Sequence, residues 1–243
     1  MGLLKKCGGC NAWSSRHRVP FREIFWEGCP FHRLSSRVTV SKGGNLFHAG
    51  DQISGAFSLS NGLVALERVS ENGNLVIFKI LQPGAFFPCS SLLRDGLHTT
   101  TARALTDITA CFIPMDRLAA AIKDDPSVSA ALIKLSAAEI LENEDAIFRL
   151  CSVSLQDRVL DTLAMLAEEL GDQDANGDLH LTLPMAWSDF SAMVGSGPEV
   201  ISRLLRRLMN SGRISFTKRN ITLHRPRENF RVGSADQAPY TFE

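Results

Sequence analysis

Residues 187–209 read WSDFSAMVGSGPEVISRLLRRLM, and this stretch decides how the chain is interpreted. Trp187 to Val194 has a helical pattern, and Gly195-Ser196-Gly197 forms a tight turn. Pro198 then opens a second helix, which extends to Met209, at a position that suits proline. Two short helices around such a turn are typical of a helix-turn-helix.

The second helix has a polar face and an apolar face. Residues three or four positions apart make the polar face, namely Glu199, Ser202, Arg203 and Arg206, whereas Leu204, Leu205 and Leu208 face the core. In a DNA major groove, arginine pairs with guanine, glutamate accepts from cytosine and serine serves either. We therefore expect this helix to read base edges.

A basic β-hairpin is predicted directly after these helices. Residues 213–216 and 221–224 are its strands, and residues 217–220 join them with Lys218 and Arg219 at the tip. Basic side chains at such a tip suit phosphate contacts. An ordinary solvated helix followed by a hairpin is the simpler alternative. The turn, the charge and the hairpin occur together, which favours double-stranded DNA as a partner.

The formal net charge of zero conceals a strong asymmetry along the chain. Residues 184–225 hold seven Lys or Arg against two acids, whereas residues 139–178 hold eleven acids against two arginines. The C-terminal part is therefore basic. No apolar run is long enough to span a membrane and the first residues lack a signal peptide, so we expect a soluble cytoplasmic protein with no membrane partner.

Short β-rich runs separated by glycines fill the region before residue 114. Asn61-Gly62 and Asn72-Gly73 are hairpin-turn signals between such runs. Evenly spaced short strands of this kind indicate a small antiparallel barrel or jelly roll. We expect strands at residues 37–41, 46–48, 56–59, 63–69, 75–81, 99–104 and 108–113.

Helical patterns follow after residue 114. Residues 115–123 predict a short helix, Asp125-Pro126 opens a much longer one, and residues 155–170 predict another amphipathic helix. Residues 171–178 are polar and rich in turn formers, so we expect a loop there. A calcium loop is not expected, because its closing glutamate is missing.

The long helix carries residues at alternating steps of three and four, namely Ala130, Ile133, Ala137, Ile140, Glu144, Ile147 and Cys151. Such spacing suits a coiled-coil seam between two copies of the chain. The predicted dimer contacts are Ile133, Ala137, Ile140 and Ile147. A helix that packs only on its own barrel is the alternative.

Several of these stretches resemble the cyclic-AMP receptor/FNR superfamily, where FNR is the fumarate and nitrate reduction regulator. The resemblance runs from about Val38 to Leu223. It rests on residues 46–51 (LFHAGD), Gly62, Pro83-Gly84 and residues 199–204 (EVISRL). The Glu-x-x-Ser-Arg pattern of the second helix is similar to that of the FNR branch, which implies a palindromic DNA site with TTGAT half-sites.

The resemblance implies an α+β architecture with a sensory β-roll, a long dimerisation helix and a winged helix-turn-helix. The expected boundaries are 1–36 for a Cys-containing segment, 37–124 for the roll, 125–153 for the dimerisation helix, 154–225 for the DNA-binding domain and 226–243 for a tail. Its implied partners are palindromic DNA, RNA polymerase and a second copy of the chain.

A cyclic nucleotide is not expected as the effector. Relatives that bind one carry Gly-Glu for the ribose and Arg-Ser for the phosphate. Here Gly84 is followed by Ala85, and His98-Thr99 stand in place of Arg-Ser. Because an anion needs donors to replace its water, we do not expect cyclic AMP to bind.

Cysteines point to a different sensor. FNR proteins hold an oxygen-labile 4Fe-4S cluster with N-terminal cysteines and one cysteine in the barrel, and thiolates suit such a cluster. The resemblance implies Cys7, Cys10, Cys29 and Cys111 as its ligands.

One N-terminal ligand departs from the family pattern. Arg18 stands where the family carries a Cys before x-Pro-Phe, so Cys29 is a substitute that lies late in the sequence. Zinc, or no metal, is the alternative. Cys89 and Cys151 are interpreted as buried small apolar residues or a secondary thiol sensor.

The leading hypothesis is a homodimeric DNA-binding regulator that responds to oxygen or redox state and is not an enzyme. A second hypothesis is a FixK-like or haem-binding regulator of the same fold without a cluster. A thiol redox enzyme that uses Cys7 and Cys10 is disfavoured, because no strand or βαβ pattern surrounds this pair. An interaction module that does not bind DNA is the last alternative.

Overall fold

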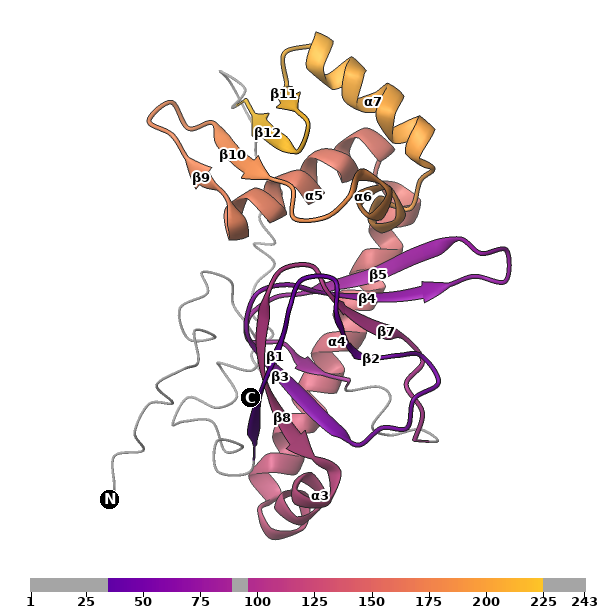
Figure 1. Cartoon of the computed structure of the whole chain (residues 1–243), viewed down its shortest axis with the longest axis vertical. Coiled ribbons are helices and arrows are strands. Elements are labelled where there is room, and N and C mark those ends of the chain that lie inside the picture. Colours follow the sequence, from indigo (N-terminus) through magenta and orange to yellow (C-terminus); the bar gives the residue numbers. More distant parts are fainter. Residues whose placement is uncertain (1–34, 89–95, 225–243) are drawn as a thin grey trace, which may run out of the picture. The chain divides into compact units, whose positions relative to one another are not determined.

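The computed structural model describes residues 35–88 and 96–224 (Figure 1). They form two compact units, one with residues 35–88, 96–159 and 184–198, and one with residues 160–183 and 199–224. Helices and antiparallel sheets follow one another along the chain, as the α+β prediction requires. The predictions for Cys7, Cys10, Cys29 and Cys89, and for the tail, concern residues outside the described ranges.

The first unit contains a β-roll of two four-stranded sheets. One sheet has the order β1 (Ser36–Val40), β8 (Ile108–Pro114), β3 (Gly55–Asn61) and β6 (Phe86–Phe87). The other has the order β2 (Asn45–Phe47), β7 (Thr101–Ala104), β4 (Val64–Val69) and β5 (Leu75–Leu81). All pairings between these strands are antiparallel, so the predicted jelly roll is confirmed.

The core of the roll lies between the inner faces of these strands. Side chains from both sheets pack together in one buried cluster that includes Phe57, Leu59, Val64, Ala102 and Ala110. Strands β7 and β8 alternate buried and partly buried side chains over part of their length, as strands with one face in the core do.

Gly62 makes the turn between β3 and β4 possible. Its φ is +84°, and a Cβ there would lie 2.4 Å from the carbonyl oxygen of Asp107. Any other residue would meet both a strained backbone and a steric clash.

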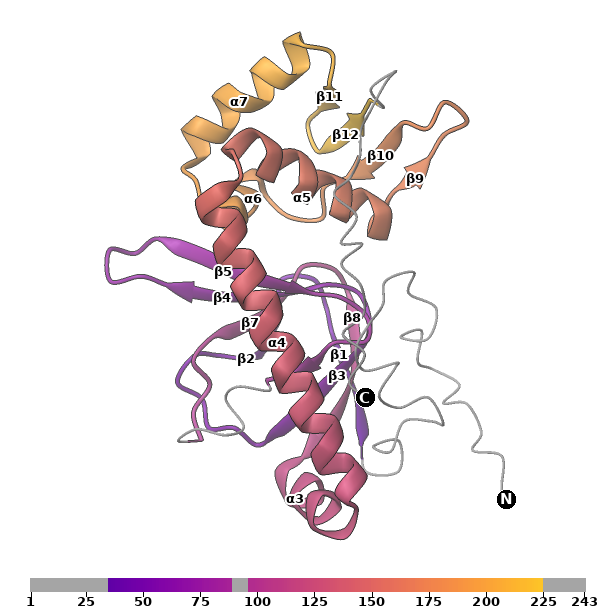
Figure 2. The same cartoon turned by 180° about the vertical axis from the view of Figure 1, so that it is seen from behind.

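Two helices follow the roll in this unit, α3 (Met115–Asp124) and α4 (Pro126–Ser152). The carboxylate of Asp125 caps α4 by accepting a hydrogen bond from the amide of Ser127 at 2.9 Å. Val128, Ala131 and Leu135 of α4 are buried in a cluster that also holds residues of α3 and the roll. Figure 2 shows α4 running along the roll.

A different face of α4 carries the predicted seam, and that face is exposed. Ile133 is 69% exposed, Ile140 57% and Ile147 62%. The helix therefore packs on its own barrel through one set of residues and leaves the residues of the predicted seam exposed. Cys151 is also exposed, so its interpretation as a buried residue is wrong, because it follows the last residues of α4 that pack on the roll.

Helix α5 (Leu155–Leu170) follows α4 in the sequence. Helix α6 (Trp187–Val194) comes later in the chain and belongs to the first unit. The second unit holds α7 (Pro198–Asn210) and a sheet of order β11 (Ile214–Thr217), β12 (Asn220–Leu223), β10 (Leu179–Thr182) and β9 (Asp172–Gln173). The prediction of a loop over residues 171–178 is wrong at β9, because its two residues pair with β10. None of the helices among the described residues has the length and hydropathy to cross a membrane.

Candidate nucleic-acid interface

Helix α7 separates its polar and apolar side chains onto different faces. Ile201, Leu204, Leu205 and Leu208 are buried, while the predicted reading residues Glu199, Ser202, Arg203 and Arg206 are all exposed. Pro198 occupies the first position of the helix, where its missing N–H costs nothing. The structure therefore places all four predicted side chains of this helix at the surface.

Arg203 and Arg206 of α7 have no counter-ion among the residues that the structure describes. Within residues 35–88 and 96–224, neither Arg203 nor Arg206 forms an ion pair or a hydrogen bond with another side chain. A guanidinium without such a partner can donate its hydrogen bonds to an external acceptor, such as a base edge or a phosphate.

Arg207 extends the basic surface of α7 and was not among the predicted contacts. It is exposed and lies one helical turn after Arg203. Its spacing of four residues from Arg203 was the available sequence signal. The exposed basic surface of α7 thus contains three arginines, Arg203, Arg206 and Arg207, rather than two.

Strands β11 and β12 form the predicted hairpin with a tight turn. Thr217 pairs with Asn220, which leaves Lys218 and Arg219 as the two turn residues. Lys218 has a φ of +59°, and both turn residues are exposed. The turn is fastened to the preceding segment, because the amide of Leu183 donates to the carbonyl of Arg219 at 2.8 Å. The two basic side chains are therefore presented by a fixed backbone.

Two histidine–carboxylate contacts anchor the β9–β10 turn, and sequence reasoning missed them. His180 Nε2 lies 3.2 Å from Asp174 Oδ2, and His224 Nδ1 lies 2.7 Å from Asp178 Oδ2. The hydrogen bond to His180 is the largest cause that lowers the pKa of Asp174. No periodic pattern signals these contacts, because they join turn residues Asp174 and Asp178 to His180 on β10 and to His224 after β12.

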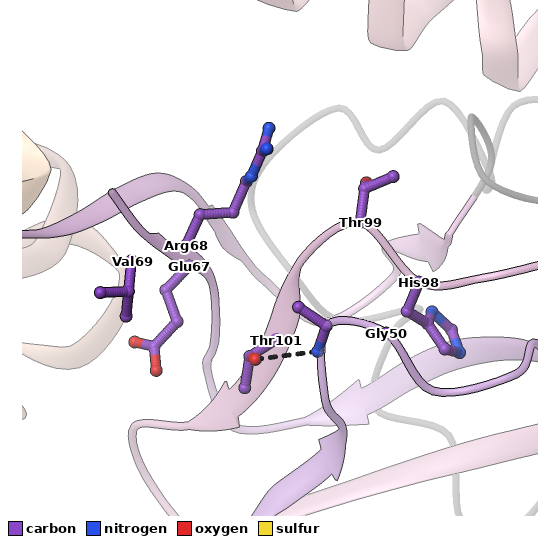
Figure 3. A pocket seen from close by; sticks show the side chains of 8 residues that line it. Gly50, Glu67, Arg68, Val69, His98, Thr99 and Thr101 are labelled. Carbon is purple, nitrogen blue, oxygen red and sulfur yellow. Dashed lines mark hydrogen bonds between the residues drawn. The ribbon is translucent and has the colours of Figure 1, made fainter. Parts of the chain in front are cut away.

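The roll has a surface hollow of about 420 Å³ beside β4 (Figure 3). Its lining consists of Ala49, Gly50, Glu67, Arg68, Val69, His98, Thr99 and Thr101. Figure 3 shows Glu67 and Arg68 pointing in opposite directions from β4. The amide of Ala49 donates to the hydroxyl of Thr101 at 3.1 Å, which closes one side of the hollow.

His98 does not suit the phosphate of a cyclic nucleotide. Its ring is 4% exposed and stacks on Phe47 with the ring centroids 3.6 Å apart. Burial lowers the pKa of His98, partly opposed by Asp51, and its Nδ1 has no hydrogen-bond partner. A neutral buried ring supplies no positive charge. Among the described residues, His98 therefore does not supply the cation that a phosphate needs at this position.

Cys111 is the one predicted cluster ligand among the described residues. It lies on β8 between Ala110, which is in the core, and Phe112, which packs against the core, so it occupies the opposite side of the strand. Its thiol is half-buried and lies 3.8 Å from the hydroxyl of Ser60. No group of three or more His, Cys, Asp or Glu side chains suited to a metal occurs in residues 35–88 and 96–224.

Comparison with known proteins matches both parts of the chain. Residues 37–125 match the cyclic nucleotide-binding domain, and residues 157–228 match the Crp-like helix-turn-helix domain. The global nitrogen regulator of Synechocystis sp. is 26% identical over 204 residues, which cover 81% of this chain and 90% of that protein. The chain is a DNA-binding transcription regulator of the CRP/FNR superfamily. This superfamily consists of transcription regulators and not of enzymes.

Other members of the superfamily are similar over most of their length. The fumarate and nitrate reduction regulatory protein of Escherichia coli (strain K12) is 25% identical over 190 residues, which cover 78% of this chain and 75% of that protein. The structure of FixK2 from Bradyrhizobium japonicum has the same fold, with a TM-score of 0.66, 22% identity and coverage of 79% of this chain and 93% of that one. The nitrogen regulator and FNR are about equally similar, so identity alone does not assign the chain to the FNR branch.

Proposed function

We propose that this CRP/FNR regulator binds, as a homodimer, a palindrome with TTGAT-type half-sites. The exposed polar face of α7 carries the proposal. Glu199, Ser202 and Arg203 lie at its N-terminal end, which is the part of a recognition helix that meets base edges. Arg203 reads a guanine through two parallel hydrogen bonds, and Glu199 accepts from a cytosine.

Phosphate contacts supply most of the affinity and fix the register. Lys218 and Arg219 at the tip of the wing and Arg206 on α7 serve this role. Because such contacts release counter-ions, affinity for every sequence falls steeply as salt increases.

The exposed seam of α4 supports the homodimer. Ile133, Ala137, Ile140 and Ile147 are exposed on a helix that already packs on the roll through other residues. A face of this kind is stabilised when a second α4 covers it, and a two-fold seam matches a palindromic site. The two copies then present their recognition helices about one DNA turn apart, roughly 34 Å.

We further propose that the regulator senses oxygen or redox state through a 4Fe-4S cluster held by Cys7, Cys10, Cys29 and Cys111. The position of Cys111 supports this assignment. Arg37 is directly opposite Cys111 in the β1–β8 pair, so β1, which follows Cys7, Cys10 and Cys29 in the sequence, begins beside this thiol. These four thiolates would hold the cluster, which would supply a redox-labile group.

Two measurements on protein purified without oxygen test these proposals. Fluorescence anisotropy compares a labelled TTGAT palindrome with a scrambled duplex at several salt concentrations, and equal affinity for both sequences contradicts specific reading. Absorption spectra with iron and sulfide analysis test the cluster before and after air is admitted. The matched variants are Cys111→Ser and Cys151→Ser, since Cys151 is an exposed thiol outside the proposed ligand set.

The expected result is a charge-transfer band that bleaches in air, is lost in Cys111→Ser and is kept in Cys151→Ser. A colourless, iron-free protein that still binds the palindrome would remove the cluster and favour the FixK-like or haem-binding alternative, which haem titration then distinguishes. The anisotropy measurement tests the DNA-binding proposal separately from the cluster.

A further inference from the structure

A single guanidinium connects the β-roll with helix α6. Arg103 lies on β7, and its Nε donates to both carboxylate oxygens of Glu67 on β4, at 3.1 and 2.9 Å. The same group reaches Asp189 on α6, with Nη1 3.4 Å from Oδ2 and Nη2 3.4 Å from Oδ1. One cation therefore holds two carboxylates, one from each element.

The two contacts differ in origin. In the β4–β7 pair, Ala65 is opposite Arg103 and Glu67 is opposite Thr101, so Glu67 is the diagonal neighbour of Arg103 on one face of the sheet. That contact is internal to the roll. Asp189 lies in the first turn of α6, and α6 also lies against β5. The contact with Asp189 therefore joins the sheet to a helix outside it.

Because its three side chains are largely buried, this contact is stronger than an ion pair between exposed side chains. The side chains of Arg103, Glu67 and Asp189 are only 22%, 12% and 16% exposed. Hydrogen bonding to Glu67 is the largest cause that raises the pKa of Arg103. Without the guanidinium, two partly buried carboxylates would repel each other. Arginine has a planar fork that can bind two carboxylates at once, which a lysine ammonium does less well.

We propose that Arg103 is a positioning residue for DNA binding, which acts through Asp189 by holding α6 against the roll. Only residues 195–197 separate α6 from α7, so a fixed α6 restricts the directions in which the recognition helix can point. The inference rests on the proposed function, because DNA affinity is its main readout. It adds a route by which the sensory roll reaches the DNA-reading helix.

Asp189→Asn tests the contact with the smallest change in shape. Its matched control is Asp116→Asn, which removes an exposed carboxylate from the first turn of α3. In the full-length protein, Asp189→Asn is expected to weaken binding of the TTGAT palindrome about fivefold, on the scale of a partly shielded ion pair. Asp116→Asn is expected to bind as the wild type does.

Variants at Arg103 separate positioning from a general loss of structure. Arg103→Lys keeps the charge but loses the fork, so its affinity is expected to lie between those of the wild type and Arg103→Met. The double variant Arg103→Met/Asp189→Asn is expected to bind no more weakly than Arg103→Met alone, because both changes break one contact. Additive losses would mean that the two residues act independently, and would overturn the inference.

Fluorescence of Trp187 on α6 tests the contact without DNA. In a chain with Trp13→Phe and Trp26→Phe, the emission of Trp187 is expected to shift in Asp189→Asn and to stay unchanged in Asp116→Asn. If the wild type does not bind the palindrome, the proposed function fails. The fluorescence test still applies in that case, and an unchanged Trp187 emission in Asp189→Asn would overturn the contact between Arg103 and Asp189. If the wild type binds, equal or tighter binding by Asp189→Asn overturns the positioning role.

Discussion

Truncation of Ile140 on α4 tests the dimer seam quantitatively. Full burial of an isoleucine side chain contributes roughly 1.5–3 kcal/mol. Ile140 is 57% exposed in a single chain, so a partner that covers it adds about 1–1.5 kcal/mol per copy. A two-fold dimer contains the residue twice, and Ile140→Ala is expected to weaken association by about 2–3 kcal/mol. That energy corresponds to a dimer Kd roughly 30- to 150-fold higher.

Sedimentation equilibrium of the full-length protein over a range of concentrations measures this Kd. The matched control is Ile122→Ala, which makes the same truncation at an exposed residue of α3, outside the seam. We expect the control to stay within about twofold of the wild type, since it lies outside the proposed interface. If Ile140→Ala and the control both have a dimer Kd within about twofold of the wild type, the proposed seam is refuted.

Three further changes probe the reading helix, the roll and its buried histidine. Arg203→Ala is expected to cost about 1–3 kcal/mol at one base pair and to relax specificity there; competition with single-base variants of the palindrome measures it, and uniform weakening on every sequence would make Arg203 a phosphate contact instead. Gly62→Ala should lower the free energy of unfolding by more than about 1 kcal/mol, because it combines a positive φ with a close approach to Asp107; urea denaturation that shows no change would contradict this. His98 has a lowered pKa in the folded protein, so the unfolded chain binds more protons, and stability should fall as the pH drops below about 6.5. His98→Phe preserves a ring against Phe47 and should remove part of that pH dependence, and melting curves of equal pH dependence in both proteins would argue against a titrating His98.

Most elements of the fold could be predicted from local pattern. The predicted starts of α4 at Pro126 and of α7 at Pro198 agree with the structure, because proline at a first turn is a local signal. Strand β6 was missed, since two residues carry no periodicity. Strand β10 was also missed, because its pairing with β12 joins residues about forty positions apart in the sequence.

Most of the candidate interface could also be predicted from local residue spacing. Steps of three and four placed Glu199, Ser202 and Arg203 on one face, and the structure exposes all three. Arg207 was missed although the same spacing applies to it. The spacing of residues along α4 predicts a seam, and that prediction is untested; the same spacing did not show that the helix packs on the roll through Val128 and its neighbours.

The sequence by itself determined the order of the elements, the turns and the faces of the helices, since each depends on residues within a few positions of one another. Tertiary structure alone decided which distant side chains meet. Arg103 lies 36 positions from Glu67 and 86 from Asp189, yet one guanidinium binds both. The environment of His98 is likewise a tertiary property, because its burial and its stacking on Phe47 depend on how the roll closes. Charge and burial at such positions follow from the packing of whole elements, for which local periodicity gives no signal.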